Sequence, residues 1–262
     1  MMKYFRLLVL SAILTLATCD TLPPTVESET LTVFAAASLT DAFEEVGHNF
    51  EVANPGVTVR LNFAGSQALR TLIEQGAQAD VFASANTKEM DTLVAGNFVA
   101  ADAPVIFLTN QLVVIMPANN PAGVENLVDL AQNGLKIVLA AKEVPVGNYS
   151  LQVLEKLDQS FGNGFKDKTL ANVVSYENTV KQVVAKVQLG EADAGIVYSS
   201  DTVAAPELKK IGIPRENNVV AEYPLAVLTQ SKNPELAQAF INYVLSSNGQ
   251  LAIRRWGFLP VK

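Results

Sequence analysis

The chain has 262 residues, of which 49% are hydrophobic and 17% are charged. This length exceeds one typical domain of roughly 100 to 200 residues, and the composition is that of a globular protein rather than a disordered or coiled-coil one. The formal net charge of −7, without a run of Lys and Arg, argues against nucleic acid as a partner, because a field of this sign repels polyanions.

The first residues have the pattern of an export signal. Lys3 and Arg6 form a basic region, and residues 7–17 form an apolar run that is shorter than the about 20 residues needed to span a bilayer. We therefore expect residues 1–18 to be a signal peptide. Loss of Lys3 and Arg6 lowers the basic count from 19 to 17 against 26 acidic residues, so the exported chain would carry a net charge of −9.

Cys19, the only cysteine, directly follows this apolar run. The segment Leu16-Ala17-Thr18-Cys19 is similar to a bacterial lipobox, whose cysteine is lipidated after cleavage, although Thr18 replaces the usual Gly or Ala. Residues 20–30 (DTLPPTVESET) have the Pro-rich, polar composition of a tether. We expect residues 19–30 to hold an exported, periplasmic or outward-facing protein to the cytoplasmic membrane. The alternative is a plain secretory leader, with Cys19 lost or left as a free thiol.

Strands alternate with helices along the rest of the chain, in two series. The first series has strands at residues 31–36, 57–63 and 81–85, and helices at residues 38–53, 66–75 and 87–95. The second has strands at residues 112–116, 136–141, 172–175, 194–198 and 223–228, and helices near residues 126–131, from residue 148, and at residues 179–189 and 234–245. This alternation predicts an α/β fold with mostly parallel sheets covered on both faces.

The residues that most enzymes need are scarce. His48 is the only histidine, and it falls in the first predicted helix, where we expect it to be solvated. With Cys19 in the leader, no Cys/His pair or zinc cluster can form. The segment Gly65-Ser66-Gln67-Ala68-Leu69 lacks the second glycine of a G-x-S-x-G nucleophile turn. We expect no catalytic residues and no cofactor, and a serine hydrolase that uses Ser66 is the weakest alternative.

A small or hydroxylated residue instead follows a strand and opens a helix at four places, namely at Ser38, Ser66, Val146-Gly147 and Thr179-Val180. The start of a helix leaves backbone N–H groups without internal partners and carries about half a positive charge, which makes it an anion site. Ligands of parallel sheets lie at the carboxyl ends of the strands, where these four junctions fall. The sequence therefore predicts a small anion held by several helix starts.

Ser38 and a further candidate donor, Tyr198, also have purely structural interpretations. Ser38 precedes Asp41 by three residues, as in a capping box at the start of a helix. Tyr198, at the carboxyl end of the predicted strand AGIVY, offers the anion a phenolic O–H donor. The same tyrosine is equally compatible with packing at the end of a strand on the domain surface.

Five segments together resemble the molybdate-binding proteins of bacterial ABC importers over residues 31–261. They are residues 33–41 (VFAAASLTD), 65–82 (GSQALRTLIEQGAQADVF), 144–149 (VPVGNY), 190–201 (GEADAGIVYSSD) and 257–260 (GFLP). The resemblance implies that molybdate or tungstate is held by backbone N–H groups and hydroxyls of Ser38, Ser66, Val146, Val180 and Tyr198. Molybdenum or tungsten would be bound only as the centre of the oxyanion. Val146 replaces a common alanine, which matters little because the donor is the backbone.

The resemblance also implies a two-domain periplasmic binding protein fold of type II, with two mostly parallel sheets, a ligand cleft and a two-strand hinge near Asn110 and Pro224. Residues 31–109 and 225–262 would form domain I, and residues 110–224 domain II. Such a protein acts as a monomer that closes on its ligand and presents it to an ABC permease.

Other ligands remain open on the sequence alone, namely sulfate, phosphate or an organic carboxylate. An organic ligand normally needs an arginine clamp, and Arg60 and Arg70 are the nearest arginines to a predicted junction. Helical spacing lets Arg70 point away from Ser66. Protonated phosphate needs an acceptor, and Glu177, just before Thr179, is the candidate carboxylate.

Overall fold

The computed structural model describes residues 28–162 and 164–261. The predicted signal peptide, Cys19 and residues 19–27 of the predicted tether lie outside the described residues. Within the described ranges, no helix combines the length and the apolar character needed to cross a membrane.

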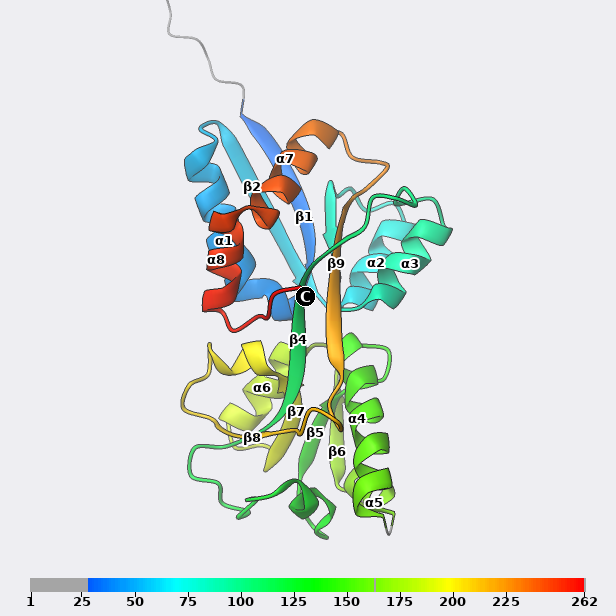
Figure 1. The fold of residues 1–262 in the computed structure, drawn as a ribbon, viewed down its shortest axis with the longest axis vertical. Helices are drawn as coiled ribbons and strands as arrows, with labels where there is room; N and C mark the ends of the chain where they lie inside the picture. Colours follow the sequence, from blue (N-terminus) through cyan, green and yellow to red (C-terminus); the bar gives the residue numbers. More distant parts are fainter. Residues whose placement is uncertain (1–27, 163, 262) are drawn as a thin grey trace, which may run out of the picture.

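The described part of the chain folds around one sheet of nine strands (Figure 1). The strands are β1 (Glu29–Ala36), β2 (Val57–Ala64), β3 (Val81–Ala83), β4 (Val105–Met116), β5 (Ile137–Ala140), β6 (Val173–Glu177), β7 (Ala194–Tyr198), β8 (Lys209–Gly212) and β9 (Val220–Val227). Their order is β2-β1-β3-β9-β4-β7-β5-β6, and β8 pairs with β4. We call the part around β1, β2 and β3 the first half of the molecule, and the part around β5, β6 and β7 the second half.

The sheet differs from the predicted pair of mostly parallel sheets. β1 pairs in parallel with β2 and β3, and β5 with β6 and β7. The remaining pairings, β3 with β9 and β4 with β7, β8 and β9, are antiparallel. The result is one mixed sheet, because the two long strands β4 and β9 run antiparallel to their neighbours and join the halves.

β4 is the element that passes from one half to the other. Up to Gln111 it pairs with β9, and from Leu112 onward it pairs with β7. The sequence predicted only the second part of this strand, because Thr109, Asn110 and Gln111 interrupt its apolar pattern. Asn110 is nevertheless fully buried, and its side-chain amide donates to the hydroxyl of Ser200 at 2.8 Å. Because this polar side chain is buried and hydrogen-bonded, the strand continues through a segment that the apolar pattern did not predict.

Helices cover both faces of the sheet (Figure 1). The first half carries α1 (Thr40–Ala53), α2 (Ser66–Glu74), α3 (Thr87–Ala95), α7 (Pro234–Leu245) and α8 (Ser247–Arg255). The second half carries α4 (Pro145–Phe161), α5 (Phe165–Ala171) and α6 (Val180–Gln188). Short 3-10 turns are η1 (Ala37–Leu39), η2 (Leu127–Ala131) and η3 (Ser199–Thr202). The predicted alternation of strands and helices is confirmed, whereas α5, α8 and β8 were not predicted.

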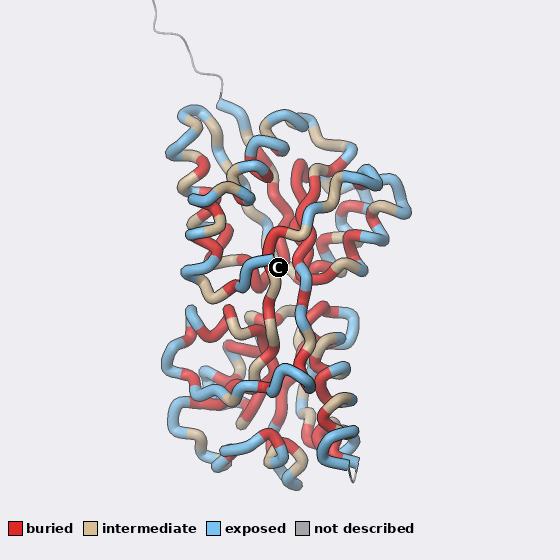
Figure 2. The backbone as a smooth tube through the Cα atoms, viewed as in Figure 1, coloured by how far each residue is buried: buried red, intermediate tan, exposed pale blue. Residues whose placement is uncertain are grey.

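The apolar core follows the sheet through both halves, and the outer faces of the helices are exposed (Figure 2). Phe43 of α1 packs against Phe107 of β4 and Phe240 of α7, with ring centroids 5.8 and 6.1 Å apart. A smaller cluster includes Leu69 of α2 and Met90 of α3. Buried apolar surface therefore fixes the helices on the sheet, and with them the junctions at the strand ends.

Candidate functional site

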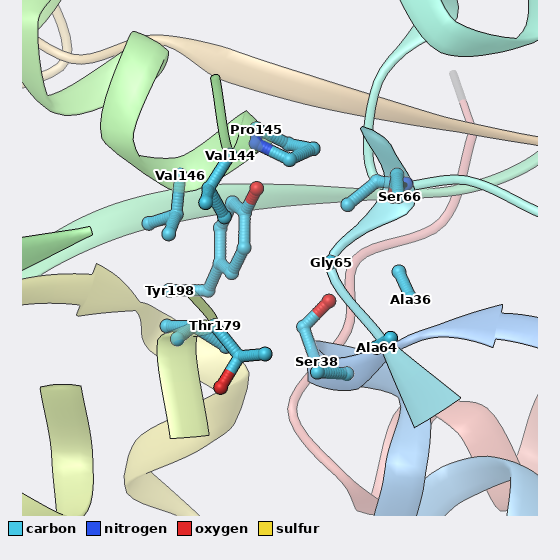
Figure 3. Close-up of a pocket in the computed structure, with 13 residues that line it drawn as sticks. Ala36, Ser38, Ala64, Gly65, Ser66, Val144, Pro145, Val146, Thr179 and Tyr198 are labelled. Atoms are coloured by element: carbon cyan, nitrogen blue, oxygen red, sulfur yellow. Dashed lines mark hydrogen bonds between the residues drawn. The ribbon is translucent and has the colours of Figure 1, made fainter. Parts of the chain in front are cut away.

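A cavity lies between the two halves (Figure 3). Thirteen residues line it, and none of them is Asp, Glu, Lys, Arg or His: Ala36, Ala37, Ser38, Ala64, Gly65, Ser66, Ala85, Val144, Pro145, Val146, Thr179, Val180 and Tyr198. All five residues predicted to bind an anion are among them. The structure therefore brings these five residues together at one cavity, and an anion here would meet donors rather than a charged side chain.

The lining comes from the carboxyl ends of strands in both halves. The first half contributes the ends of β1 and β2, the residues after them and one residue after β3, and the second half contributes residues that follow β5 and β6 and the end of β7. Because β1 runs parallel to β2, and β5 to β6 and β7, these ends meet at one edge of each half. Alanine and glycine fill most of the first half's share, which leaves room for a ligand close to the backbone.

Three helices begin at the cavity. α2 starts at Ser66, α4 at Pro145 and α6 at Val180. Ala68 and Asn148 donate to the carbonyl of the residue that precedes α2 and α4, so Ser66 and Val146 lie ahead of the first closed turn. Their N–H groups have no carbonyl of the same helix to reach, and they carry the positive end of the helix dipole.

The two serines are held in different ways. Ser66 is fully buried, and its Oγ accepts from the N–H of Ala85 at 3.0 Å, so its own hydrogen remains to be donated. Ser38 lies in η1, and its Oγ is 3.0 Å from the hydroxyl of Tyr223. The capping interpretation of Ser38 is wrong, because Leu39 occupies the position before α1 and no side chain caps that helix.

Tyr198 is 1% exposed, and within the described part of the chain its hydroxyl is buried without a hydrogen-bond partner. The surface-packing interpretation of this residue is therefore wrong. Burial raises the pKa of Tyr198 well above its ordinary value of 10.0, so the phenol stays protonated and remains a donor. Buried polar groups in proteins are almost always paired, so this hydroxyl is available to donate to a group that enters the cavity.

Charged side chains named by the sequence lie outside the lining. Arg70 pairs with Glu74 at 2.5 Å and with Glu89 at 2.6 Å, and it is not among the lining residues. Glu177 pairs with Lys186 at 2.7 Å. Partial burial acts to raise the pKa of Glu177, but hydrogen bonds from Lys186 and Ser175 outweigh it and lower the value.

Arg60 and His48 are also absent from the lining. His48 lies exposed on α1, as expected for a solvated residue. Among the described residues, neither an arginine clamp nor a carboxylate acceptor lines the cavity.

Sequence reasoning missed the residues that support the site. Tyr223 on β9 contacts Ser38, and Asp201 accepts the backbone N–H of Tyr198 at 3.1 Å through Oδ2. Burial raises the pKa of Asp201 to about 7, against the opposing effect of Lys181. Only their positions in the sequence could have indicated a supporting role, because Lys181 directly follows Val180 and Asp201 stands three residues after Tyr198.

Residues 31–259 match the model of a family described as bacterial extracellular solute-binding protein. The chain belongs to this family. It is therefore an extracellular solute-binding protein rather than an enzyme, as the sequence predicted. It is 37% identical over 236 residues to the molybdate-binding protein ModA of Mycobacterium tuberculosis, covering 90% of this chain and 86% of the relative. It is 33% identical to a putative ABC transporter substrate-binding lipoprotein, YvgL of Bacillus subtilis, covering 95% of each chain.

Solved structures share the architecture. The substrate-binding domain of a putative molybdenum ABC transporter from Clostridium difficile matches with a TM-score of 0.67 and 33% identity, covering 90% of this chain and 100% of that one. The sulfate-binding protein SubI of Mycobacterium tuberculosis matches with a TM-score of 0.81 and 20% identity, covering 89% and 88%. At that identity SubI shows the fold alone. The expected α/β fold of periplasmic binding proteins is thereby confirmed.

Proposed function

We propose that this protein captures molybdate or tungstate in the cavity between its halves and delivers the oxyanion to an ABC import permease. The observation that carries the proposal is the buried, unpartnered hydroxyl of Tyr198 in a cavity where three helices begin. The relative ModA is named molybdate-binding, and the similar chain from Clostridium difficile is described as part of a putative molybdenum transporter. Both descriptions agree with this ligand class.

The site works through oriented donors. Hydroxyls of Ser38, Ser66 and Tyr198 and backbone N–H groups of Val146 and Val180 surround the cavity from both halves. A dianion with four oxygen acceptors matches such a set without a cation, because each donor is fixed by the fold before the ligand arrives. The lining residues are buried or nearly so, which strengthens each hydrogen bond relative to water.

Selectivity follows from size and protonation. Sulfate is smaller, so a cavity shaped for the longer metal–oxygen bonds leaves some of its hydrogen bonds long. Phosphate carries a proton near neutral pH, and that proton needs an acceptor. Glu177, the candidate acceptor, is held by Lys186 outside the lining. An organic carboxylate would lack an arginine clamp here.

The proposal includes closure of the two halves on the ligand. Gln111 of β4 still pairs with Val220 of β9, and Leu112 already pairs with Tyr198 of β7. This change of partner lies next to the predicted hinge at Asn110. It supports a domain I of residues 31–109 and 225–262 and a domain II of residues 110–224, joined by β4 and β9.

We also propose that the protein is exported by its signal peptide, is held at the membrane by a lipid on Cys19, and acts as a monomer. The relative YvgL is named a putative lipoprotein, which agrees with the lipobox-like segment. Mass spectrometry of the N-terminal peptide decides between the alternatives. An acylated Cys19 supports the anchor, and a mature chain that begins after Cys19 excludes it.

Calorimetric and thermal-shift titrations with molybdate, tungstate, sulfate and phosphate test the ligand. Ligand at 100 times its Kd stabilises the folded state by about 2.7 kcal/mol, which raises the melting temperature measurably. We expect this stabilisation with molybdate and tungstate. A shift with sulfate or phosphate alone would identify that anion as the ligand instead, and no shift with either metal oxyanion would overturn the proposal. Elemental analysis after native purification provides an independent check.

A further inference from the structure

Lys181 connects the two halves of the molecule beside the cavity. It lies in the first turn of α6, directly after Val180, and its Nζ is 2.5 Å from Oδ2 of Asp41. Asp41 belongs to the first turn of α1, in the other half (Figure 1). This salt bridge therefore joins the two halves directly beside the lining residue Val180.

Lys181 also faces the carboxyl group that supports Tyr198. Its Nζ is 3.8 Å from Oδ1 of Asp201, whose side chain is fully buried. Oδ2 of Asp201 accepts the backbone N–H of Tyr198, whereas Oδ1 has no hydrogen-bond partner within the described ranges. A buried carboxylate is costly unless a cation is near, so the ammonium group compensates Asp201 as well as Asp41.

We propose that Lys181 is a positioning residue that ties closure of the cleft to the geometry of the anion site. This inference rests on the proposed function. When the ammonium group reaches Asp41, the start of α6 with Val180 is drawn toward the half that carries Ser38. At the same time its charge stabilises the carboxylate of Asp201, which accepts the backbone N–H of Tyr198. Donors from both halves are thereby set by one side chain that does not itself line the cavity.

A neighbouring ion pair provides a matched control. Lys186 lies in the same helix, and its Nζ is 2.7 Å from Glu177 of β6, so both partners belong to the second half. The Lys181 and Lys186 side chains are 30% and 34% exposed. Each lysine also faces a largely buried carboxyl group, since the side chains of Asp201 and Glu177 are 0% and 13% exposed. Loss of either lysine should therefore lower stability, and only loss of Lys181 should affect closure.

The experiment measures the Kd and the dissociation rate of molybdate for the full chain and for K181M, D41N, K181M/D41N and K186M. We expect K181M and D41N each to raise the Kd about tenfold, mostly through faster release, because the closed state loses population without this contact. The double variant should be no weaker than the worse single variant, since both remove the same contact. K186M should bind as the unmodified protein does.

Small-angle X-ray scattering without added ligand tests the same contact independently of binding. K181M should enlarge the radius of gyration relative to the unmodified protein, and K186M should not. Unchanged Kd and unchanged scattering for K181M would overturn the inference. If the unmodified protein binds no molybdate, the proposed function fails, and the scattering comparison still decides whether Lys181 holds the halves together.

Discussion

The hydroxyl of Ser38 lies 3.0 Å from the hydroxyl of Tyr223, which joins the cavity to the strand that crosses between the halves. Tyr223 is fully buried on β9, and its ring packs edge-on against Tyr198 with centroids 5.7 Å apart. The ring of Phe258 packs against Tyr223 as well, with centroids 5.7 Å apart. One residue of the crossing strand thus supports donors that come from opposite halves.

We expect Tyr223→Phe to weaken anion binding about five- to tenfold, because Ser38 loses the partner that orients its hydroxyl. The cost corresponds to one hydrogen bond, about 1 kcal/mol. Isothermal titration with molybdate measures it. Tyr176→Phe is the control, because Tyr176 is 55% exposed on β6 and is not among the lining residues. Equal affinities for both variants would show that Ser38 needs no support from Tyr223.

Tyr198→Phe should separate stability from binding. Because the hydroxyl of Tyr198 has no partner within the described part of the chain, its removal should leave the free energy of unfolding without ligand unchanged or raised. Anion affinity should fall roughly ten- to hundredfold, as expected for a hydrogen bond of about 1.5 to 3 kcal/mol to a charged group. Urea unfolding and calorimetry measure the two effects. A large loss of stability without ligand would contradict this assignment.

Most of the fold was predictable, because its strands and helices have regular apolar patterns. α1, with Phe43, Val46 and Phe50 buried at helical spacing, is one example. The mixed sheet was not predictable, since the direction in which β4 meets β9 and β7 is a tertiary property. α4 begins at Pro145, ahead of the predicted start near residue 148, because proline fits the first turn of a helix.

The site was predictable as far as it is local. Ser66 and Val146 stand at strand–helix junctions, and such junctions meet wherever parallel strands end together. The supporting contacts join residues far apart in the chain, such as Ser38 with Tyr223 and Lys181 with Asp41. No spacing rule connects residues at those separations, so only the three-dimensional arrangement reveals them.

Gly65→Ala should hold the cleft open. Gly65 has φ −60 and ψ 137, which alanine adopts without strain, so the effect would be steric. A Cβ would lie 2.9 Å from the carbonyl oxygen of Asn178, which belongs to the backbone of the other half, and 2.5 Å from Oε1 of the more adaptable Gln67. We expect about tenfold weaker molybdate binding, because the closed state loses population.

The matched control for this substitution is Gly212→Ala on β8. A Cβ there meets no heavy atom within 4 Å, so affinity and stability should stay unchanged. Scattering curves should show a more extended Gly65→Ala variant. If Gly65→Ala binds as tightly as the unmodified protein, Asn178 must shift easily, and the close approach has no role in closure.

The buried carboxyl group of Asp201 should make stability depend on pH. Burial raises its pKa from 3.8 to about 7, against the effect of Lys181, while Asp41 adds to the increase. Between these two values the folded state holds a proton that the unfolded state has lost, so the free energy of unfolding falls as pH rises from about 4 to 7.

Asp201→Asn keeps an acceptor for the N–H of Tyr198 and does not titrate. Relative to the unmodified protein without ligand, this variant should therefore gain stability steadily as the pH rises across that window. Urea unfolding at several pH values measures the difference, and parallel curves would mean that Asp201 ionises normally in the fold.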